Sequence, residues 1–209
     1  VVEPACDDAF RAWLGETLAK DSFLAAQSAT GAARRALLIR ALGYEPHWRS
    51  FAALGRLDWD EGRYTDAARN LQSAINQLVD GPADHAATEA EIAEVYRLAS
   101  AALALADEPV AMPRTRSGAP GGVLATSIRG FEVSEVPLPI TFEFNSTQFD
   151  TTGAAYAEML VEHLTMTAPR AITLGGHTDP VGSEAFNLGL SEARAEALAA
   201  FLRARGFEG

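Results

Sequence analysis

The chain has 209 residues, of which 48% are hydrophobic, and it carries a formal charge of -11 at pH 7. This length and hydrophobic content suffice for one large or two small packed domains, and they exclude a disordered chain. The negative charge is shared about equally by the two halves of the chain. Neither half therefore offers the basic surface that a nucleic acid or an anionic lipid surface requires, and we expect neither as a partner.

The cysteine content and the start of the chain bear on its compartment. Cys6 is the single cysteine, so the fold is not a disulfide-stapled scaffold. The sequence begins Val1-Val2-Glu3 without an initiator methionine, which favours a processed export signal. The longest nearly uncharged helical stretch, 98–106, has about half of the ~20 residues that a bilayer-spanning helix needs, so we expect no transmembrane segment.

The first half, about 7–107, is predicted to be helical. It is rich in alanine and leucine, and its apolar residues recur at intervals of three and four. Asp7 or Asp8 is expected to cap a first helix whose apolar stripe contains Phe10, Trp13, Leu14 and Leu18. Further helices are predicted at about 32–42, from His47 onward, and at about 87–105.

Three groups of residues within 48–81 follow a helix-turn-helix spacing: Phe51-x2-Leu54-Gly55, Gly62-Arg63-Tyr64 and Ala67-x3-Leu71-x2-Ala74. This spacing resembles one tetratricopeptide (TPR) repeat, which has a period of ~34 residues. Gly55 and Ala67 are expected to let two antiparallel helices approach closely, whereas Asp58 stands where the repeat has an aromatic residue. We expect 1–108 to form a TPR-like helical domain. It either offers a concave surface to an unidentified protein or peptide, or packs as a bundle against the rest of the chain.

Residues 109–122 are predicted to be a linker because Pro and Gly are dense there. Beyond it, alternating apolar and polar residues predict strands at 139–144 and 171–174. A helix capped by Thr151 or Thr152 and ended by Pro169 is expected between them, and a longer helix from about 183 to 205 is expected after them. This order implies an α/β sandwich with a right-handed crossover. Two further strands are possible, at 123–128 and 130–133. The predicted fold class is therefore α+β with two domains, an all-α array followed by an α/β sandwich.

Three motifs in the second half stand out: Ile140-Thr141-Phe142-Glu143-Phe144-Asn145-Ser146, Gly176-His177-Thr178-Asp179-x-x-Gly182-Ser183 and Asn187-x-x-Leu190-Ser191-x-x-Arg194-Ala195. Together they closely resemble the OmpA-like peptidoglycan-associating domain, over about 123–209. The resemblance implies non-catalytic binding to the diaminopimelate residue of peptidoglycan. It also implies a place in the periplasm of a Gram-negative bacterium, in association with the cell wall or the outer membrane.

The sequence departs from the pattern of this family at its C-terminal end. Members continue with further strand and helix elements and a late Asn-Arg-Arg motif, so the domain is expected to be incomplete. Three explanations are open: the sequence is a fragment, 123–136 supplies a compensating strand, or a partner completes the fold.

Asp179 and Arg194 are the central candidates for ligand binding. Asp179 follows a predicted strand, and Arg194 lies about two turns into the next predicted helix. A carboxylate and a guanidinium presented together suit a zwitterionic amino-acid head, which the free end of diaminopimelate is. The alternative is a structural salt bridge between loop and helix. The resemblance further places Asn145 and Thr178 at the edge of the pocket.

The remaining candidates have supporting roles. The resemblance suggests Asn187 and Ser191 as supports at the start of the helix. His177 is expected to make structural hydrogen bonds, because a metal site needs three or four ligands and no HxxxH or His/Cys cluster accompanies it. We therefore expect no metal and no cofactor.

Two functions are compatible with these residues. The leading one is a non-catalytic protein that tethers itself or a partner to the cell wall through peptidoglycan. The alternative is an adaptor in which the TPR-like domain is the active part and the OmpA-like domain is a scaffold. A hydrolase is disfavoured, because the sequence has no Gly-x-Ser-x-Gly elbow, no cysteine nucleophile in a structured element and no paired-carboxylate motif.

Overall fold

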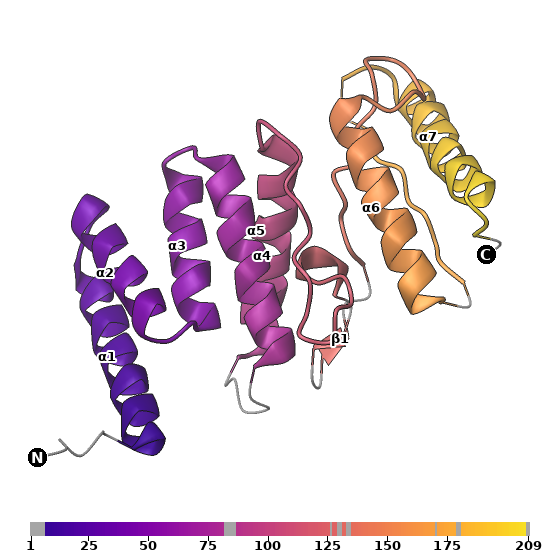
Figure 1. Ribbon diagram of the computed structural model, residues 1–209. Coiled ribbons are helices and arrows are strands. Elements are labelled where there is room, and N and C mark those ends of the chain that lie inside the picture. Colours follow the sequence, from indigo (N-terminus) through magenta and orange to yellow (C-terminus); the bar gives the residue numbers. More distant parts are fainter. Residues whose placement is uncertain are drawn as a thin grey trace, which may run out of the picture.

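The computed structural model describes residues 7–81, 87–125, 127–128, 131–132, 135–169, 171–178 and 181–207. Most of these residues belong to helices that follow one another along the molecule, with the two termini at opposite ends (Figure 1). The helices are α1 (Asp8–Ser28), α2 (Gly31–Tyr44), α3 (Trp48–Asp60), α4 (Tyr64–Asp80), α5 (Glu89–Leu105), α6 (Thr151–Thr167) and α7 (Glu184–Ala204). The prediction of a helical first half is confirmed. No described helix combines the length and the apolar character that crossing a bilayer requires.

Several helices begin where the sequence supplies a capping side chain. The Asp7 carboxylate accepts a hydrogen bond from the Phe10 amide at 2.6 Å. At α5, Thr88 and Glu91 form a reciprocal capping box, in which the Glu91 carboxylate accepts from the Thr88 amide at 2.8 Å. This bond, together with Arg49, lowers the pKa of Glu91. The helix boundaries are thus set largely by short-range hydrogen bonds.

Helices α3 and α4 pack as an antiparallel pair with very little space between their backbones. A Cβ atom at Gly55 would lie 2.6 Å from Leu71 Cγ and 3.2 Å from the Ala67 carbonyl oxygen. Only glycine fits at this position, as expected from the spacing of Gly55 and Ala67. The identification of this pair as a TPR-type repeat stays a prediction.

A buried charge joins α2, α3 and α4. The side chain of Asp58 is 1% exposed and lies 2.7 Å from Arg35 Nη2. It also accepts hydrogen bonds from Arg63 Nε at 3.1 Å and from Asn70 Nδ2 at 2.7 Å. Burial raises the pKa of Asp58, while the bonds from Asn70 and Arg35 lower it, so these partners offset the cost of burial only in part. The position that departs from the TPR pattern is therefore a polar junction between three helices.

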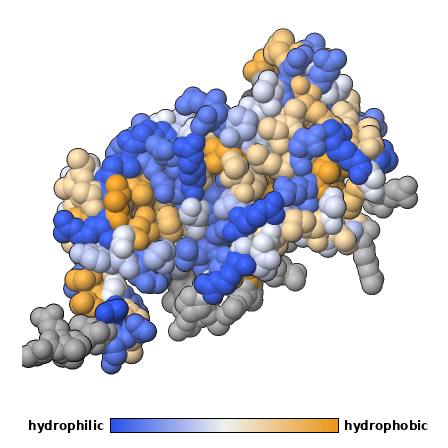
Figure 2. Space-filling model, in the orientation of Figure 1, coloured by the Kyte–Doolittle hydropathy of each residue, from blue (hydrophilic) through white to orange (hydrophobic). Residues whose placement is uncertain are grey.

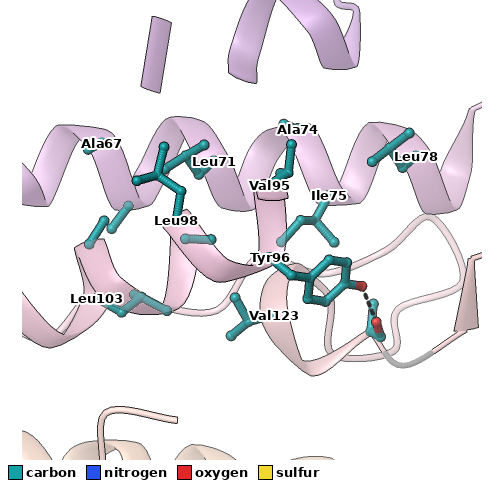
Figure 3. Packing of buried hydrophobic residues seen from close by; sticks show 14 of the residues in the cluster. Ala67, Leu71, Ala74, Ile75, Leu78, Val95, Tyr96, Leu98, Leu103 and Val123 are labelled. Atoms are coloured by element: carbon teal, nitrogen blue, oxygen red, sulfur yellow. Dashed lines mark hydrogen bonds between the residues drawn. The ribbon is translucent and has the colours of Figure 1, made fainter. Parts of the chain in front are cut away.

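The main hydrophobic core lies between α4 and α5 and extends into the segment 110–125. Figure 3 shows Tyr96 of α5 reaching past Val123, and its hydroxyl donates a hydrogen bond to the Ala125 carbonyl oxygen. Tyr156 of α6 joins the same core, and its hydroxyl accepts from the Val110 amide at 3.0 Å. Burial raises the pKa of both tyrosines.

Residues 109–122, which were expected to be a linker, are thus largely packed against the helices. Asn76 of α4 holds this segment at two points: its Nδ2 donates to the Arg114 carbonyl at 2.9 Å and its Oδ1 accepts from the Gly122 amide at 2.8 Å. A short 3-10 helix, η1 (Gly122–Leu124), follows. The division of the chain into domains 1–108 and 123–209 stays a prediction.

The predicted α/β sandwich is wrong. Within the described residues, the strands are β1 (Ser127–Ile128) and β2 (Phe131–Glu132), which form one short antiparallel pair. They lie in the region where two additional strands were considered possible. The segments 139–144 and 171–174 contain no strand, although α6 and α7 lie where helices were predicted.

The alternating pattern at 139–144 and 171–174 indicates which side of each segment is buried. A strand also requires a hydrogen-bonded neighbour, which the pattern does not supply. Ile140, Ile172 and Leu174 do pack on the core between α6 and α7. However, the first segment turns back on itself after Phe142, whose single bridge partner is Phe149. No backbone hydrogen bond of 171–178 to another described residue is present. The two segments therefore contribute side chains to the core without forming a sheet.

Two further details of the helices differ from expectation. The cap of α6 is Asp150, whose carboxylate accepts from the Gly153 amide at 2.7 Å, rather than Thr151 or Thr152. In α1, the buried residues are Ala19, Ser22 and Ala26, whereas Phe10, Trp13 and Leu14 are exposed. Small residues face α2 where the two helices pack closely, and Phe23 packs beside them, whereas Phe10, Trp13 and Leu14 point away.

His163 of α6 is expected to make stability depend on pH. Its side chain is buried, its Nδ1 has no hydrogen-bond partner among the described residues, and burial lowers its pKa. Protonation then favours the unfolded state, so the contribution of neutral His163 is complete above the usual pKa of about 6.5 and is lost as the pH falls below it. We expect His163→Gln to lose less stability than the wild type between neutral pH and pH about 5, in thermal denaturation followed by circular dichroism.

A matched control is His177→Gln, because the His177 side chain is exposed. This variant is expected to keep the pH dependence of the wild type. Identical pH profiles for His163→Gln and the wild type would contradict the assignment to His163.

Candidate functional site

An open cavity of about 510 Å³ lies where α7 begins. His177 and Thr178 line it on one side, Gly182 and Glu184 lie at the start of the helix, and Asn187 and Ser191 line it from the face of α7. The lining is mostly polar, and the amino end of α7 gives it a partial positive charge. These features suit a small polar or charged ligand.

Two glycines give the loop before α7 its shape. A Cβ atom at Gly176 would lie 2.1 Å from the Ser191 carbonyl oxygen, so this loop touches the backbone of α7 directly. Gly182 has a φ of 113°, a value that residues with a Cβ atom rarely adopt. Ser183 then caps the helix by accepting from the Phe186 amide at 3.3 Å. The glycines and the cap thus fix the wall of the cavity.

Arg194 lies at the far edge of this surface. It follows Ser191 by three residues and Asn187 by seven, so the three side chains share one face of α7. Its Nε donates to the Ser146 carbonyl at 3.0 Å and its Nη2 donates to the Glu143 carbonyl at 3.3 Å. The guanidinium is therefore fixed by backbone oxygens of a neighbouring turn.

Aromatic side chains hold that turn on α7. The rings of Phe142 and Phe149 are 4.9 Å apart, and Phe149 contacts Phe201 of α7 at 5.2 Å. The Arg194 guanidinium lies 5.1 Å from the centroid of the Phe142 ring. At the tip of the turn, Asn145 is exposed and has a φ of 51°.

The candidate residues from the sequence thus divide into two neighbouring groups. His177, Thr178, Asn187 and Ser191 line the cavity. Arg194 and the turn that carries Asn145 are bound to each other beside it. Asp179 lies outside the described residues, so its geometry with Arg194 stays a prediction.

Three of the supporting side chains have local roles. Asn187 Nδ2 donates to the Val181 carbonyl at 3.3 Å, and the Ser191 hydroxyl donates to the Leu188 carbonyl at 2.8 Å. Where the structure describes the chain, no hydrogen bond to the His177 imidazole is present. The described residues also contain no group of three His, Cys, Asp or Glu side chains that could hold a metal ion.

Sequence reasoning did not find the groups that orient Arg194. These are the carbonyl oxygens of Glu143 and Ser146 and the ring of Phe142. Every residue has a carbonyl, so no residue-type signal distinguishes these two. A partial signal was present in Phe142 and Phe149, an aromatic pair that flanks a turn rich in polar residues.

Comparison with known proteins gives the family of this region. Residues 141–209 match the OmpA family. The C-terminal region is an OmpA family domain. The match covers the cavity, Arg194 and the turn 142–149, while α1–α5 lie outside it. No solved structure matches the chain.

Curated relatives of the OmpA family domain are named outer membrane protein A. Those of Escherichia fergusonii, Escherichia coli O157:H7 and Shigella flexneri are each 33% identical over 69 residues, which is 32% of this chain. The aligned part covers 28% of the first relative and 20% of the other two. The similarity therefore concerns this one domain and not the whole length of either protein.

Proposed function

We propose that the protein binds cell-wall peptidoglycan without covalent bonds or catalysis, through its OmpA family domain, and so tethers itself or a partner to the wall. The observation that carries the proposal is the position of Arg194. Its guanidinium is held in a fixed orientation beside a polar cavity, on the helix face shared by Asn187 and Ser191. The described contacts use two of its five N–H donors, which leaves donors for a ligand carboxylate.

The ligand group that fits is the zwitterionic end of diaminopimelate. Its carboxylate would accept hydrogen bonds from Arg194, and its ammonium would donate to Asp179 and to oxygens of the cavity such as the Thr178 hydroxyl. Each charge-assisted bond contributes roughly 1.5–3 kcal/mol. A few such bonds correspond to a dissociation constant between about a micromolar and a millimolar, which suits a reversible tether.

The compartment proposed for this interaction is the periplasm of a Gram-negative bacterium, in contact with the outer membrane or the wall. The formal charge of -11 does not attract the chain to a wall that is itself rich in carboxylates. Binding would therefore depend on local contacts at the cavity. Added salt would weaken binding only by screening those contacts.

The test is retention of the purified protein on diaminopimelate-type peptidoglycan in a sedimentation assay. We expect Arg194→Gln to lower retention about tenfold or more, because it removes the fork that receives the carboxylate. Asp179→Asn is expected to do the same at the ammonium end. Thr178→Val tests the cavity without touching the turn at Glu143 and Ser146, and it is expected to lower retention less.

The matched control is Arg203→Gln. Arg203 lies on the same helix and its substitution makes the same change of charge, but it lies away from the cavity. This variant is expected to be retained like the wild type. Peptidoglycan that carries lysine in place of diaminopimelate lacks the second carboxylate and is expected to retain no variant well. Equal retention of the wild type, Arg194→Gln and Asp179→Asn, all with native circular dichroism, would overturn the proposal.

A further inference from the structure

The segment between α5 and α6 contributes side chains to two hydrophobic cores. We call 110–125 the bridging segment. Val110 and Val123 are at most 4% exposed and belong to the main core with α4 and α5. Leu124, the next residue, is 4% exposed as well, but it belongs to the core between α6 and α7, together with Leu202 of α7. The bridging segment therefore cannot leave one core without disturbing the other.

Helix α6 reaches the main core across the bridging segment. Tyr156 is 1% exposed and belongs to that core, and its hydroxyl accepts from the Val110 amide at 3.0 Å. Met112 and Ile140 pack against both cores. Figure 1 places the bridging segment between α5 and α6, and Figure 2 shows the coloured atoms of the two sides as one continuous body across the middle of the view. The apolar interior is therefore continuous from α3–α5 into the OmpA family domain.

Polar side chains from both sides fix the position of the bridging segment. On the α4 side, Asn76 binds it at two points, and the Asp80 carboxylate accepts from the Arg116 amide at 2.8 Å. On the α6 side, the Arg114 guanidinium pairs with Glu162. Both side chains of this pair are about half exposed, so its contribution to stability is small. The polar contacts thus set the position of the segment, and the buried apolar side chains supply most of the stabilising free energy.

The bridging segment lies too close to α4 to act as a flexible linker. A Cβ atom at Gly121 would lie 2.1 Å from Asn76 Oδ1, and one at Gly122 would lie 2.2 Å from Gln72 Oε1. The Gly121 amide also donates to the Pro113 carbonyl at 2.7 Å, so the segment folds back on itself as a hairpin. A flexible linker would let the two sides move independently, whereas these contacts hold the segment on α4.

We propose that the bridging segment couples the stability of the α3–α5 core to that of the OmpA family domain. The two are expected to unfold as one unit, and a ligand bound at the cavity beside α7 is expected to stabilise both. Contacts between domains of one chain are often polar, and such domains then unfold in separate steps. The shared elements here are buried and apolar, which favours a single step. The effect of a ligand rests on the function proposed above, whereas joint unfolding does not.

The first test follows the two sides by separate spectroscopic signals. The tryptophans of the chain are Trp13, Trp48 and Trp59, so the OmpA family domain has none. In a Trp13→Phe background, tryptophan fluorescence reports on the α3–α5 core, because Trp48 belongs to this core and Trp59 packs against it. Circular dichroism reports on all helices. We expect both signals to change at the same urea concentration, as joint unfolding requires.

Leu202→Ala in this background tests the coupling from the far side. Leu202 lies in α7 and is 2% exposed. Its truncation is expected to lower the urea midpoints of the tryptophan signal and of circular dichroism together, by about 1 M. Leu202→Val is a smaller truncation and is expected to shift both midpoints by less. The control is Leu188→Ala, the same change in the same helix at a side chain that is 59% exposed, and it is expected to leave both midpoints near the wild-type value.

The second test uses a soluble muropeptide that carries diaminopimelate. At ten times its dissociation constant, it is expected to raise the tryptophan midpoint by about 0.5 M, and to have no effect on Arg194→Gln. If the muropeptide and the wall do not bind, the function proposed above fails, and Leu202→Ala alone decides on the coupling. A muropeptide that binds without moving the tryptophan midpoint overturns the coupling and leaves wall binding intact. A tryptophan midpoint that Leu202→Ala does not lower overturns the coupling as well.

Discussion

Replacing Asp58 with alanine is expected to lower the free energy of unfolding by about 3–5 kcal/mol. The carboxylate is 1% exposed and binds Arg35 of α2, Arg63 just before α4 and Asn70 of α4. Its removal leaves the partly buried guanidinium groups of Arg35 and Arg63 with the more exposed Glu61 as the carboxylate that still pairs with both. The measurement is urea denaturation followed by tryptophan fluorescence, to which Trp59, next to this position in α3, contributes.

Asp60→Ala is the matched control for this effect. Asp60 lies two residues away in the same helix and pairs with Arg56 at 3.3 Å, but both side chains are more than half exposed. An exposed pair of this kind contributes about 1 kcal/mol at most. If Asp58→Ala unfolded at the same urea concentration as Asp60→Ala, the buried junction would not be a determinant of the array's stability.

Gly153→Val is expected to have the largest effect on the OmpA family domain, at about 3 kcal/mol. A Cβ atom at this position would lie 1.8 Å from the Thr141 carbonyl oxygen and 2.7 Å from the Thr141 nitrogen. Thr141 is fixed in turn by Asp150, whose carboxylate accepts from its hydroxyl at 2.7 Å. The side chain therefore has no free space, and the segment that begins at Thr141 must move away from α6.

This displacement is expected to reach the candidate site. The segment continues into the turn whose carbonyl oxygens hold Arg194, so Gly153→Val should weaken retention on peptidoglycan although Gly153 is not in the cavity. Thermal denaturation and the sedimentation assay together check this expectation. Gly189→Ala in α7 is the control, since nothing lies within 4 Å of a Cβ atom there. Wild-type melting and retention for Gly153→Val would refute the coupling.

Features that depend on neighbouring residues in the sequence were predictable. The capping residue Asp7, the bounds of the last helix near 183 and 205 and the close approach at Gly55 all follow from residue type and spacing. Thr178 and Ser191, which the motifs singled out, both lie at the cavity because they belong to elements that are adjacent along the chain, while their role in binding stays a prediction. Local chemistry decides these features.

Features that depend on distant partners were not predictable. The alternation at 171–174 correctly marks Ile172 and Leu174 as buried, but it does not reveal whether another strand lies alongside. In α1, the large apolar residues were taken for the core stripe, whereas close packing on α2 selects Ala19 and Ala26. Pairing and packing between elements are set by the whole fold and leave no signal of their own in a single segment.

The way in which Arg194 is held has a consequence for the acidity at which the site works. Arginines in binding sites are often oriented by an aspartate or glutamate, whose ion pair is lost when the carboxylate is protonated. The described partners of Arg194 are two carbonyl oxygens and an aromatic ring, none of which titrates. These three contacts therefore do not weaken as the pH falls, so a compartment that acidifies with its surroundings would change the ionisation of the ligand while leaving them in place.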